Sequence, residues 1–159
     1  YVFVYLCNSY QKRQYLNKNN GIVGRVVAID YGTKRVGLAV TDYMQVIATK
    51  LTTVSTIDIF PFLKDYMSRE EVDAIVVGNP KQMDNTPSES AKAVNIFVDN
   101  LAKAFPDKDI YMVDERFTSK IASQTIAQSG LKKKKRQDKG LIDSIAAVLI
   151  LQDFMQMKK

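Results

Sequence analysis

The 159-residue chain contains no histidine and a single cysteine, Cys7. The lack of histidine excludes histidine-based acid–base catalysis and histidine-ligated zinc. One cysteine can form neither an internal disulfide nor a cysteine zinc site, which indicates a reducing compartment, and we expect a cytoplasmic protein. Any chemistry must therefore come from carboxylates, Lys, Arg, Ser, Thr, Tyr or a metal ion held by oxygen atoms.

Long apolar runs are also scarce. No uninterrupted apolar stretch approaches the roughly 20 residues that span a bilayer. The opening segment YVFVYL is short and lacks the basic flank of a signal peptide. We therefore expect no membrane partner. Hydrophobic residues still make up 46% of the chain, enough for the core of one domain. The net charge of +6 indicates an acidic partner, of which nucleic acid is the commonest, although many soluble proteins are mildly basic.

Residue patterns predict one α/β domain over residues 25–157. Residues 1–24, rich in Asn, Gln, Lys and Tyr, are predicted to form a tail outside the main fold. Three consecutive strands indicate an antiparallel meander, and later strands that alternate with helices indicate parallel pairing. We therefore expect a five-stranded mixed sheet with helices on both faces. Strands are predicted at 25–29, 35–41, 46–54, 72–78 and 109–113, and helices at 57–71, 89–105, 119–130 and 141–155.

Acidic residues stand where these elements end or begin. Asp30 ends the first strand, Asp114 and Glu115 follow the fifth, and Asp143 is predicted in the first turn of the last helix. Ligands of such sheets gather outside the carboxyl ends of the parallel strands. Each acid also has an ordinary explanation. Asp30 could cap the turn by accepting a hydrogen bond from a backbone N–H, and Asp114 or Glu115 could pair with Arg116. Asp143 could simply be stabilised by the dipole at the start of the helix.

Taken together, these acids predict a metal site. Carboxylates that converge from distant parts of the chain repel one another and need a cation, and oxygen ligands suit Mg²⁺ or Mn²⁺. With no histidine available, water activated by the metal is the natural nucleophile. The chemistry that fits is phosphodiester hydrolysis, with two ions as the expected number.

Four blocks in order, AIDYGTKRVGLAV, AIVVGNPKQMDNT, VDERFTS and KGLIDSIAAVLILQ, strongly resemble the YqgF/RuvX family of RNase H-like nucleases. A lone DYGTK would be weak, because sugar kinases and actin-like ATPases use a similar acidic hairpin. The resemblance implies an RNase H-like fold, with Asp30, Glu115 and Asp143 as metal ligands. Strand alternation admits only one of Asp114 and Glu115 to the site, and the family pattern favours Glu115, with Asp114 kept as a further catalytic candidate.

Basic residues surround the predicted site. The turn after Asp30 would bring backbone N–H groups, Lys34 and Arg35 to a phosphate; the ordinary alternative is that Gly32 simply supplies a positive φ to the turn. The loop LKKKKRQDKG is either a solvated loop or a flap that binds the nucleic-acid backbone without reading its sequence. Arg116 could orient Glu115 or contact the scissile phosphate. The predicted phosphate-binding residues are Lys34, Arg35, Lys81, Arg116, Lys132, Lys133, Lys134, Lys135, Arg136 and Lys139.

Several functions stay open from the sequence. Family members act on the 5′ end of pre-16S rRNA or on Holliday junctions, and both pre-rRNA and branched DNA present backbone phosphates. A monomer or a homodimer is expected, since cutting two strands of a junction would need a dimer. A non-catalytic nucleic-acid-binding module is a further alternative. A nucleotide-dependent phosphotransferase is disfavoured because such enzymes enclose the nucleotide with a second domain.

Overall fold

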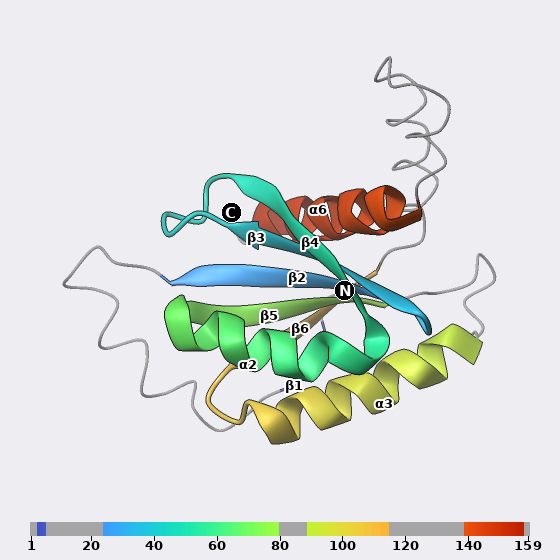
Figure 1. The fold of residues 1–159 in the computed structure, drawn as a ribbon. Coiled ribbons are helices and arrows are strands. Elements are labelled where there is room, and N and C mark those ends of the chain that lie inside the picture. Colours follow the sequence, from blue (N-terminus) through green and yellow to red (C-terminus); the bar gives the residue numbers. More distant parts are fainter. Residues whose placement is uncertain (1–2, 6–23, 80–88, 115–138, 158–159) are drawn as a thin grey trace, which may run out of the picture.

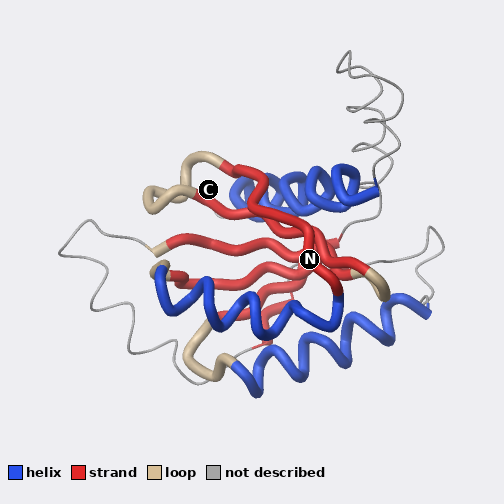
Figure 2. The backbone as a smooth tube through the Cα atoms, viewed as in Figure 1, coloured by secondary structure: helices blue, strands red, loops and turns tan. Residues whose placement is uncertain are grey.

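The structure is a computed structural model that describes residues 3–5, 24–79, 89–114 and 139–157 (Figure 1). It has three layers, with one mixed sheet between helix α6 on one face and helices α2 and α3 on the other (Figures 1 and 2). The predicted arrangement of a mixed sheet with helices on both faces is therefore confirmed. The helices are η1 (Thr56–Asp58), α2 (Ile59–Arg69), α3 (Glu89–Ala104) and α6 (Lys139–Met157).

The strands are β1 (Phe3–Tyr5), β2 (Arg25–Tyr31), β3 (Arg35–Thr41), β4 (Ala48–Ser55), β5 (Val72–Asn79) and β6 (Asp109–Asp114). Their order in the sheet is β1-β6-β5-β2-β3-β4. As predicted, β2, β3 and β4 form an antiparallel meander, while β5 pairs in parallel with β2 and with β6. The carboxyl ends of β2, β5 and β6 thus lie at the same edge of the sheet.

The sheet has one strand more than the five expected. Residues Phe3–Tyr5, predicted to lie in a tail outside the fold, pair antiparallel with Ile110–Met112 of β6. Without β1, the outer edge of β6 would present unpaired N–H and C=O groups, and the segment VFVY has the β-branched and aromatic residues that favour pairing there. The prediction of an external tail is therefore wrong for these three residues, and residues 6–23 lie outside the described part of the chain.

Alternation along the strands separates two cores. Val27 and Ile29 of β2 pack toward α2 and α3, in a cluster that includes Leu63 and Leu101. Val26 and Ala28 point to the opposite face, and the cluster there includes Ile150, Leu151 and Phe154 of α6. Asp30 follows Val26 and Ala28 with a period of two, and this register places it on the α6 face.

Helix α6 begins two residues earlier than predicted. It starts at Lys139, which was assigned to the basic loop, so Asp143 lies beyond the first turn and not within it. The positive end of the helix dipole therefore stabilises the Asp143 carboxylate less than expected, because that effect is concentrated in the first turn.

Helix α6 is also unusually apolar. It is the one helix in the described residues that is long and apolar enough to cross a membrane by length and composition, although no uninterrupted apolar run of that length was found in the sequence. Its buried side chains pack on the sheet, which accounts for part of its apolar content.

Candidate metal and nucleic-acid site

The β2–β3 turn holds the first part of the site. The backbone N–H of Gly32 donates to the Arg35 carbonyl at 3.0 Å, and the Thr56 hydroxyl donates to the Gly32 carbonyl at 2.7 Å. A Cβ on Gly32 would lie 2.6 Å from the Arg35 carbonyl oxygen. Glycine is therefore required here by a close backbone approach, and the φ of Gly32 is not in the positive range that the sequence suggested. The braced turn leaves Lys34 exposed.

Helix α6 is seated directly on β3 beside Asp30. Gly37 is the cross-strand partner of Asp30, and a Cβ on Gly37 would lie 2.1 Å from the carbonyl oxygen of Asp143. Only glycine allows the helix backbone to come this close to the strand. On the next strand, the Thr53 hydroxyl donates to the Gly140 carbonyl at 2.8 Å. These contacts bring Asp143 next to Asp30.

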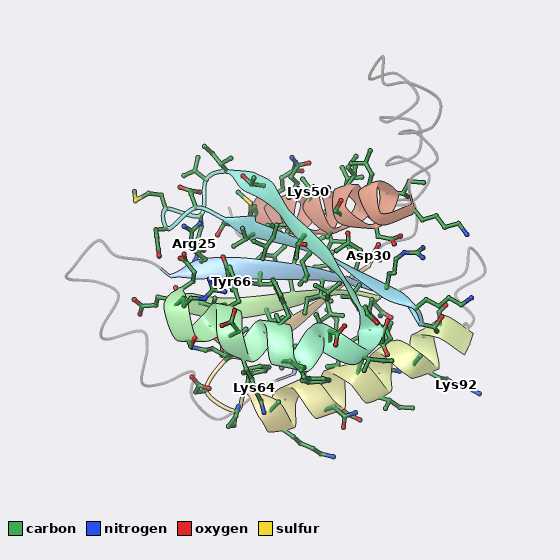
Figure 3. The ribbon with its side chains drawn as sticks, in the orientation of Figure 1. Arg25, Asp30, Lys50, Lys64, Tyr66 and Lys92 are labelled. Carbon is green, nitrogen blue, oxygen red and sulfur yellow. The ribbon has the colours of Figure 1, made fainter. Side chains whose placement is uncertain are left out.

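Asp30 lies at the carboxyl end of β2, on the side that faces α6 (Figure 3). Burial first, and then the negative charge of Asp143, raise the pKa of the Asp30 carboxyl from 3.8 to about 7. Both causes oppose the charged form of the group. Near neutral pH the folded protein therefore carries an electrostatic penalty at Asp30 that a cation would remove.

Asp143 already has a cationic partner. The Nε of Arg35 donates to Oδ2 of Asp143 at 3.2 Å, and the two side chains are 41% and 26% exposed. Arg35 was predicted to contact phosphate, and that contact stays a prediction, while the structure places its guanidinium against the second carboxylate of the site. Because the Arg35 side chain is still partly exposed, an anion from solvent can also reach it.

Two further predicted cations belong to the described residues. Lys34 lies in the turn before Arg35, and Lys139 is exposed at the start of α6, four residues before Asp143. Positive charge thus flanks the two carboxylates on β2–β3 and on α6. The remaining predicted cations lie outside the described residues: Lys81, Arg116, Lys132, Lys133, Lys134, Lys135 and Arg136.

Strand β6 approaches the same edge of the sheet. The backbone of Asp114 ends the strand and pairs with Asn79 of β5. Tyr111 and Val113 pack on the α6 side, whereas Ile110 and Met112 pack on the side of α2 and α3. The described residues end here, so neither the side chain of Asp114 nor any part of Glu115 is described.

The chemistry of the donor set fits a divalent ion. Asp30 and Asp143 offer oxygen ligands only, and burial, followed by the charge of Asp143, raises the pKa of Asp30, so a cation bound between the two carboxylates would stabilise its charged form. Hard cations such as Mg²⁺ and Mn²⁺ prefer such oxygen donors. Within the described ranges no third acidic, histidine or cysteine side chain joins the pair. The predicted third ligand, Glu115, falls in the undescribed segment.

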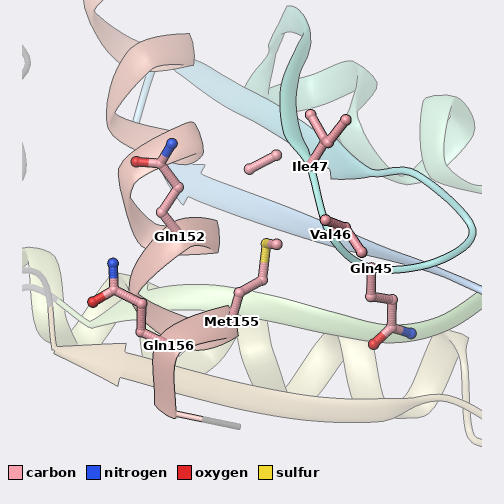
Figure 4. A pocket seen from close by; sticks show the side chains of 7 residues that line it. Gln45, Val46, Ile47, Gln152, Met155 and Gln156 are labelled. Carbon is pink, nitrogen blue, oxygen red and sulfur yellow. The ribbon is translucent and has the colours of Figure 1, made fainter. Parts of the chain in front are cut away.

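A pocket of different character lies at the other end of α6 (Figure 4). It is formed by the β3–β4 loop and the last turns of the helix, roughly 14–20 Å along the helix axis from Asp143 at 1.5 Å per residue. Its lining contains no ionisable side chain, so it does not suit a metal ion or a phosphate. The lining residues are Gln45, Val46, Ile47, Ala48, Gln152, Met155 and Gln156.

Sequence reasoning missed two residues that build the site. Gly37 interrupts the apolar strand RVGLAVT, and a glycine inside a strand is a known sign of a close backbone approach. That sign could have predicted the seat of α6. Thr53 carries no such sign, because threonine is common in strands and its hydrogen-bond partner lies far away in the sequence.

Solved structures support the fold assignment. The chain is similar to the Thermus thermophilus RuvC structure described as "T. thermophilus RuvC in complex with Holliday junction substrate". The identity is 20%, the TM-score is 0.52, and the match covers 84% of this chain and 96% of that one. The predicted RNase H-like fold is therefore confirmed.

Closer similarity is found among curated proteins. A Flavobacterium johnsoniae protein named "Putative pre-16S rRNA nuclease" is 54% identical over 135 residues, which covers 85% of this chain and 98% of that protein. A Parabacteroides distasonis protein with the same name is 51% identical over 137 residues, covering 86% and 98%. The sequence profile of a family described as "RuvX: Holliday junction resolvase" matches residues 24–157. The chain therefore belongs to the RuvX family, as its four sequence blocks predicted.

Proposed function

We propose that this chain is a divalent-metal-dependent nuclease that hydrolyses phosphodiester bonds in structured RNA, at the 5′ end of pre-16S rRNA. The observation that carries the proposal is that Asp143, near the start of α6, lies against Asp30 of β2, in a setting that opposes the charge on Asp30. Membership of the RuvX family and the nuclease names of the curated relatives support the same class of reaction.

Three carboxylates would hold the metal, namely Asp30, Asp143 and Glu115. Tyr111 and Val113 of β6 pack on the α6 side, where Asp30 also lies, so Glu115 rather than Asp114 would share that side if the alternation of β6 extends one residue past its end. Mg²⁺ or Mn²⁺ is the proposed ion, with two ions as the expected number. When bound, a divalent ion polarises the scissile phosphate and lowers the pKa of water.

The other side chains of the site have the task of binding the substrate. Lys34 and Lys139 are exposed on either side of the carboxylates and suit phosphate oxygens. Arg35 neutralises Asp143 and offers its exposed face to the same phosphates. The basic run from Lys132 to Arg136 would extend this contact along the nucleic-acid backbone, together with Lys81 and Arg116.

RNA is favoured over branched DNA by the names of the curated relatives, which are about half identical over most of the chain. The description of the family, Holliday junction resolvase, supports the second candidate, a nuclease of branched DNA. We also place the activity in the cytoplasm. A monomer is sufficient to cut one strand of rRNA, whereas cutting two strands of a junction needs the two active sites of a homodimer.

The test is a side-by-side cleavage assay on a pre-16S rRNA fragment and a four-way DNA junction, in Mg²⁺ and in Mn²⁺. Asp30→Asn, Asp143→Asn and Glu115→Gln should each abolish cleavage and keep substrate binding, because Asn and Gln preserve size but remove the charge that holds the metal. Asp114→Asn should have a milder effect. Asp153→Asn, on the same helix but near its other end, is the matched control and should cleave like the parent.

Two results together would favour the second candidate, a nuclease of branched DNA: cleavage of the junction but not of the RNA, and a dimeric mass in light scattering. If the protein binds both substrates without metal and cleaves neither, it is a non-catalytic nucleic-acid-binding module. If Asp30→Asn binds Mn²⁺ and cuts at the parent rate, the nuclease proposal fails and Asp30 is a turn residue.

A further inference from the structure

Three cross-strand neighbours lie in one row under the start of α6. Asp30 of β2 pairs with Gly37 of β3, and Gly37 pairs with Thr53 of β4. Partners in a row share one face of the sheet, so all three residues belong to the α6 face. The helix crosses this row with Gly140 over Thr53 and Asp143 over Gly37.

The spacing of the helix matches the spacing of the strands. From Gly140 to Asp143 the helix rises about 4.5 Å, and neighbouring strands lie about 4.8 Å apart. The helix therefore advances from β4 to β3 within one turn. The next strand in the row is β2, where the charge of Asp143 acts on Asp30.

The hydroxyl of Thr53 is the polar tie between this row and the helix. It donates to the Gly140 carbonyl at 2.8 Å. The buried Ser144 hydroxyl lies 2.9 Å from the same carbonyl oxygen, so that carbonyl has a donor on the helix as well. The Thr53 bond is therefore not needed to satisfy Gly140, and its consequence is to hold the first turn of α6 on β4.

We propose that Thr53 is a positioning residue for the metal site: its hydroxyl holds the first turn of α6 so that Asp143, seated on the bare backbone of Gly37, stays against Asp30. This inference rests on the proposed function, since Asp30 and Asp143 are there assigned to the metal. Thr53 does not bind the ion itself; it acts through the helix. Because β4 is the edge strand, the tie also anchors the end of the helix that follows the undescribed segment 115–138.

The test uses the full chain and Mn²⁺ alone, without nucleic acid. Thr53→Val removes the hydroxyl at nearly constant volume, and Thr53→Ser restores it. Thr52→Val is the matched control, because Thr52 is adjacent, also partly buried, and paired with Leu38 on the opposite face of the sheet. Calorimetry gives the Kd for Mn²⁺, and amide hydrogen exchange at Asp143 and Ser144 reports the seating of the helix.

We expect Thr53→Val to weaken Mn²⁺ binding about fivefold to tenfold, which corresponds to one ordinary hydrogen bond, and to speed exchange at Asp143 and Ser144. Its Tm should stay within a few degrees of the parent, and Thr53→Ser and Thr52→Val should behave like the parent. Thr53→Ala carries the same expectation and replaces Thr53→Val if that variant does not fold.

Parent-like Mn²⁺ affinity and parent-like exchange in Thr53→Val would overturn the inference, as would equal weakening in Thr52→Val. Failure of the proposed function gives a different result: the parent and Asp30→Asn would then bind Mn²⁺ alike, while amide exchange would still report whether Thr53 holds the helix.

Discussion

Arg35 and Asp143 form an ion pair that joins the start of β3 to the second turn of α6, with 3.2 Å between Nε and Oδ2. Both side chains are partly exposed, so the pair contributes at most about 1 kcal/mol to the free energy of unfolding. Its main consequence is electrostatic. Arg35 supplies a positive charge to the Asp143 carboxylate. The proposed metal ion would bind the same carboxylate.

Arg35→Gln should therefore separate metal binding from substrate binding. Without the guanidinium, Mn²⁺ no longer shares Asp143 with another cation, and we expect its affinity to rise about twofold to fivefold, as measured by calorimetry. Binding of RNA should weaken, and the plot of log affinity against log salt should flatten by roughly 0.7, because one phosphate is no longer neutralised.

Arg69→Gln is the control for this change, because Arg69 also pairs with an acid, Asp65, but on the exposed surface of α2. It should leave Mn²⁺ affinity unchanged. Weaker Mn²⁺ binding in Arg35→Gln would contradict the idea of shared occupancy and would show that Arg35 orients Asp143 for the ion.

The raised pKa of Asp30 gives a pH dependence of stability. With a pKa of 3.8 unfolded and about 7 folded, the folded state binds more protons between these values, so stability should fall as pH rises from about 4 to about 7 and then level off. The loss is about 4 kcal/mol at most, taking 1.36 kcal/mol per pKa unit. Mn²⁺ should restore stability above pH 7, where Asp30 is charged.

Thermal melts of the parent and of Asp30→Asn from pH 4 to pH 8, without metal, measure this effect. The difference between the two curves isolates Asp30 from the other acids, and Asp30→Asn should become the more stable protein as pH rises. Parallel curves would mean that the carboxyl of Asp30 titrates normally and is not held in an unfavourable setting.

Short-range patterns predicted the elements of the fold well because the signals are local. Two apolar segments, RVVAI and RVGLAVT, separated by a short glycine-containing turn identified β2 and β3, and a nearly continuous apolar run identified β5. The position of Asp30 at the end of β2 followed from the same pattern. The convergence of Asp30 with Asp143 followed from the order of strands and helices.

Long-range contacts explain what could not be predicted. Lys139 and Gly140 looked like the end of a basic loop, since glycine is a poor helix former, yet they begin α6, where Thr53 bonds to Gly140. Likewise, three residues near the N-terminus gave no sign of their partner on β6. In each case the deciding group lies on another strand, which a local pattern does not contain.

The sixth strand predicts a modest effect of truncation. Removing residues 1–5 takes away β1, but β6 keeps its pairing with β5, so the edge of the sheet that carries the site is retained. We expect the Tm to fall by no more than about 4 °C, because the hydrogen bonds of three residues are largely offset by their ordering entropy. Cleavage well below the Tm should equal that of the parent.

Removal of residues 1–2 alone, which leaves β1 in place, is the control for this truncation and should not change the Tm. Absence of cleavage in the longer truncation, at a temperature where the protein is still folded, would show that the N-terminal segment acts on the site.

The basic run from Lys132 to Lys135 should contribute affinity without selectivity. Alanine at these four positions should weaken RNA and DNA alike and flatten the salt dependence by roughly 0.7–0.9 for each phosphate that is no longer neutralised, because each neutralised phosphate releases counterions. Filter binding at several salt concentrations measures the slope of log affinity against log salt concentration. Alanine at four other exposed lysines, Lys50, Lys64, Lys92 and Lys103, controls for the change in net charge and should leave the slope unchanged. An unchanged slope in the fourfold variant would identify the run as a solvated loop, and phosphate binding would then rest on Lys34, Arg35 and Lys139 around the two carboxylates.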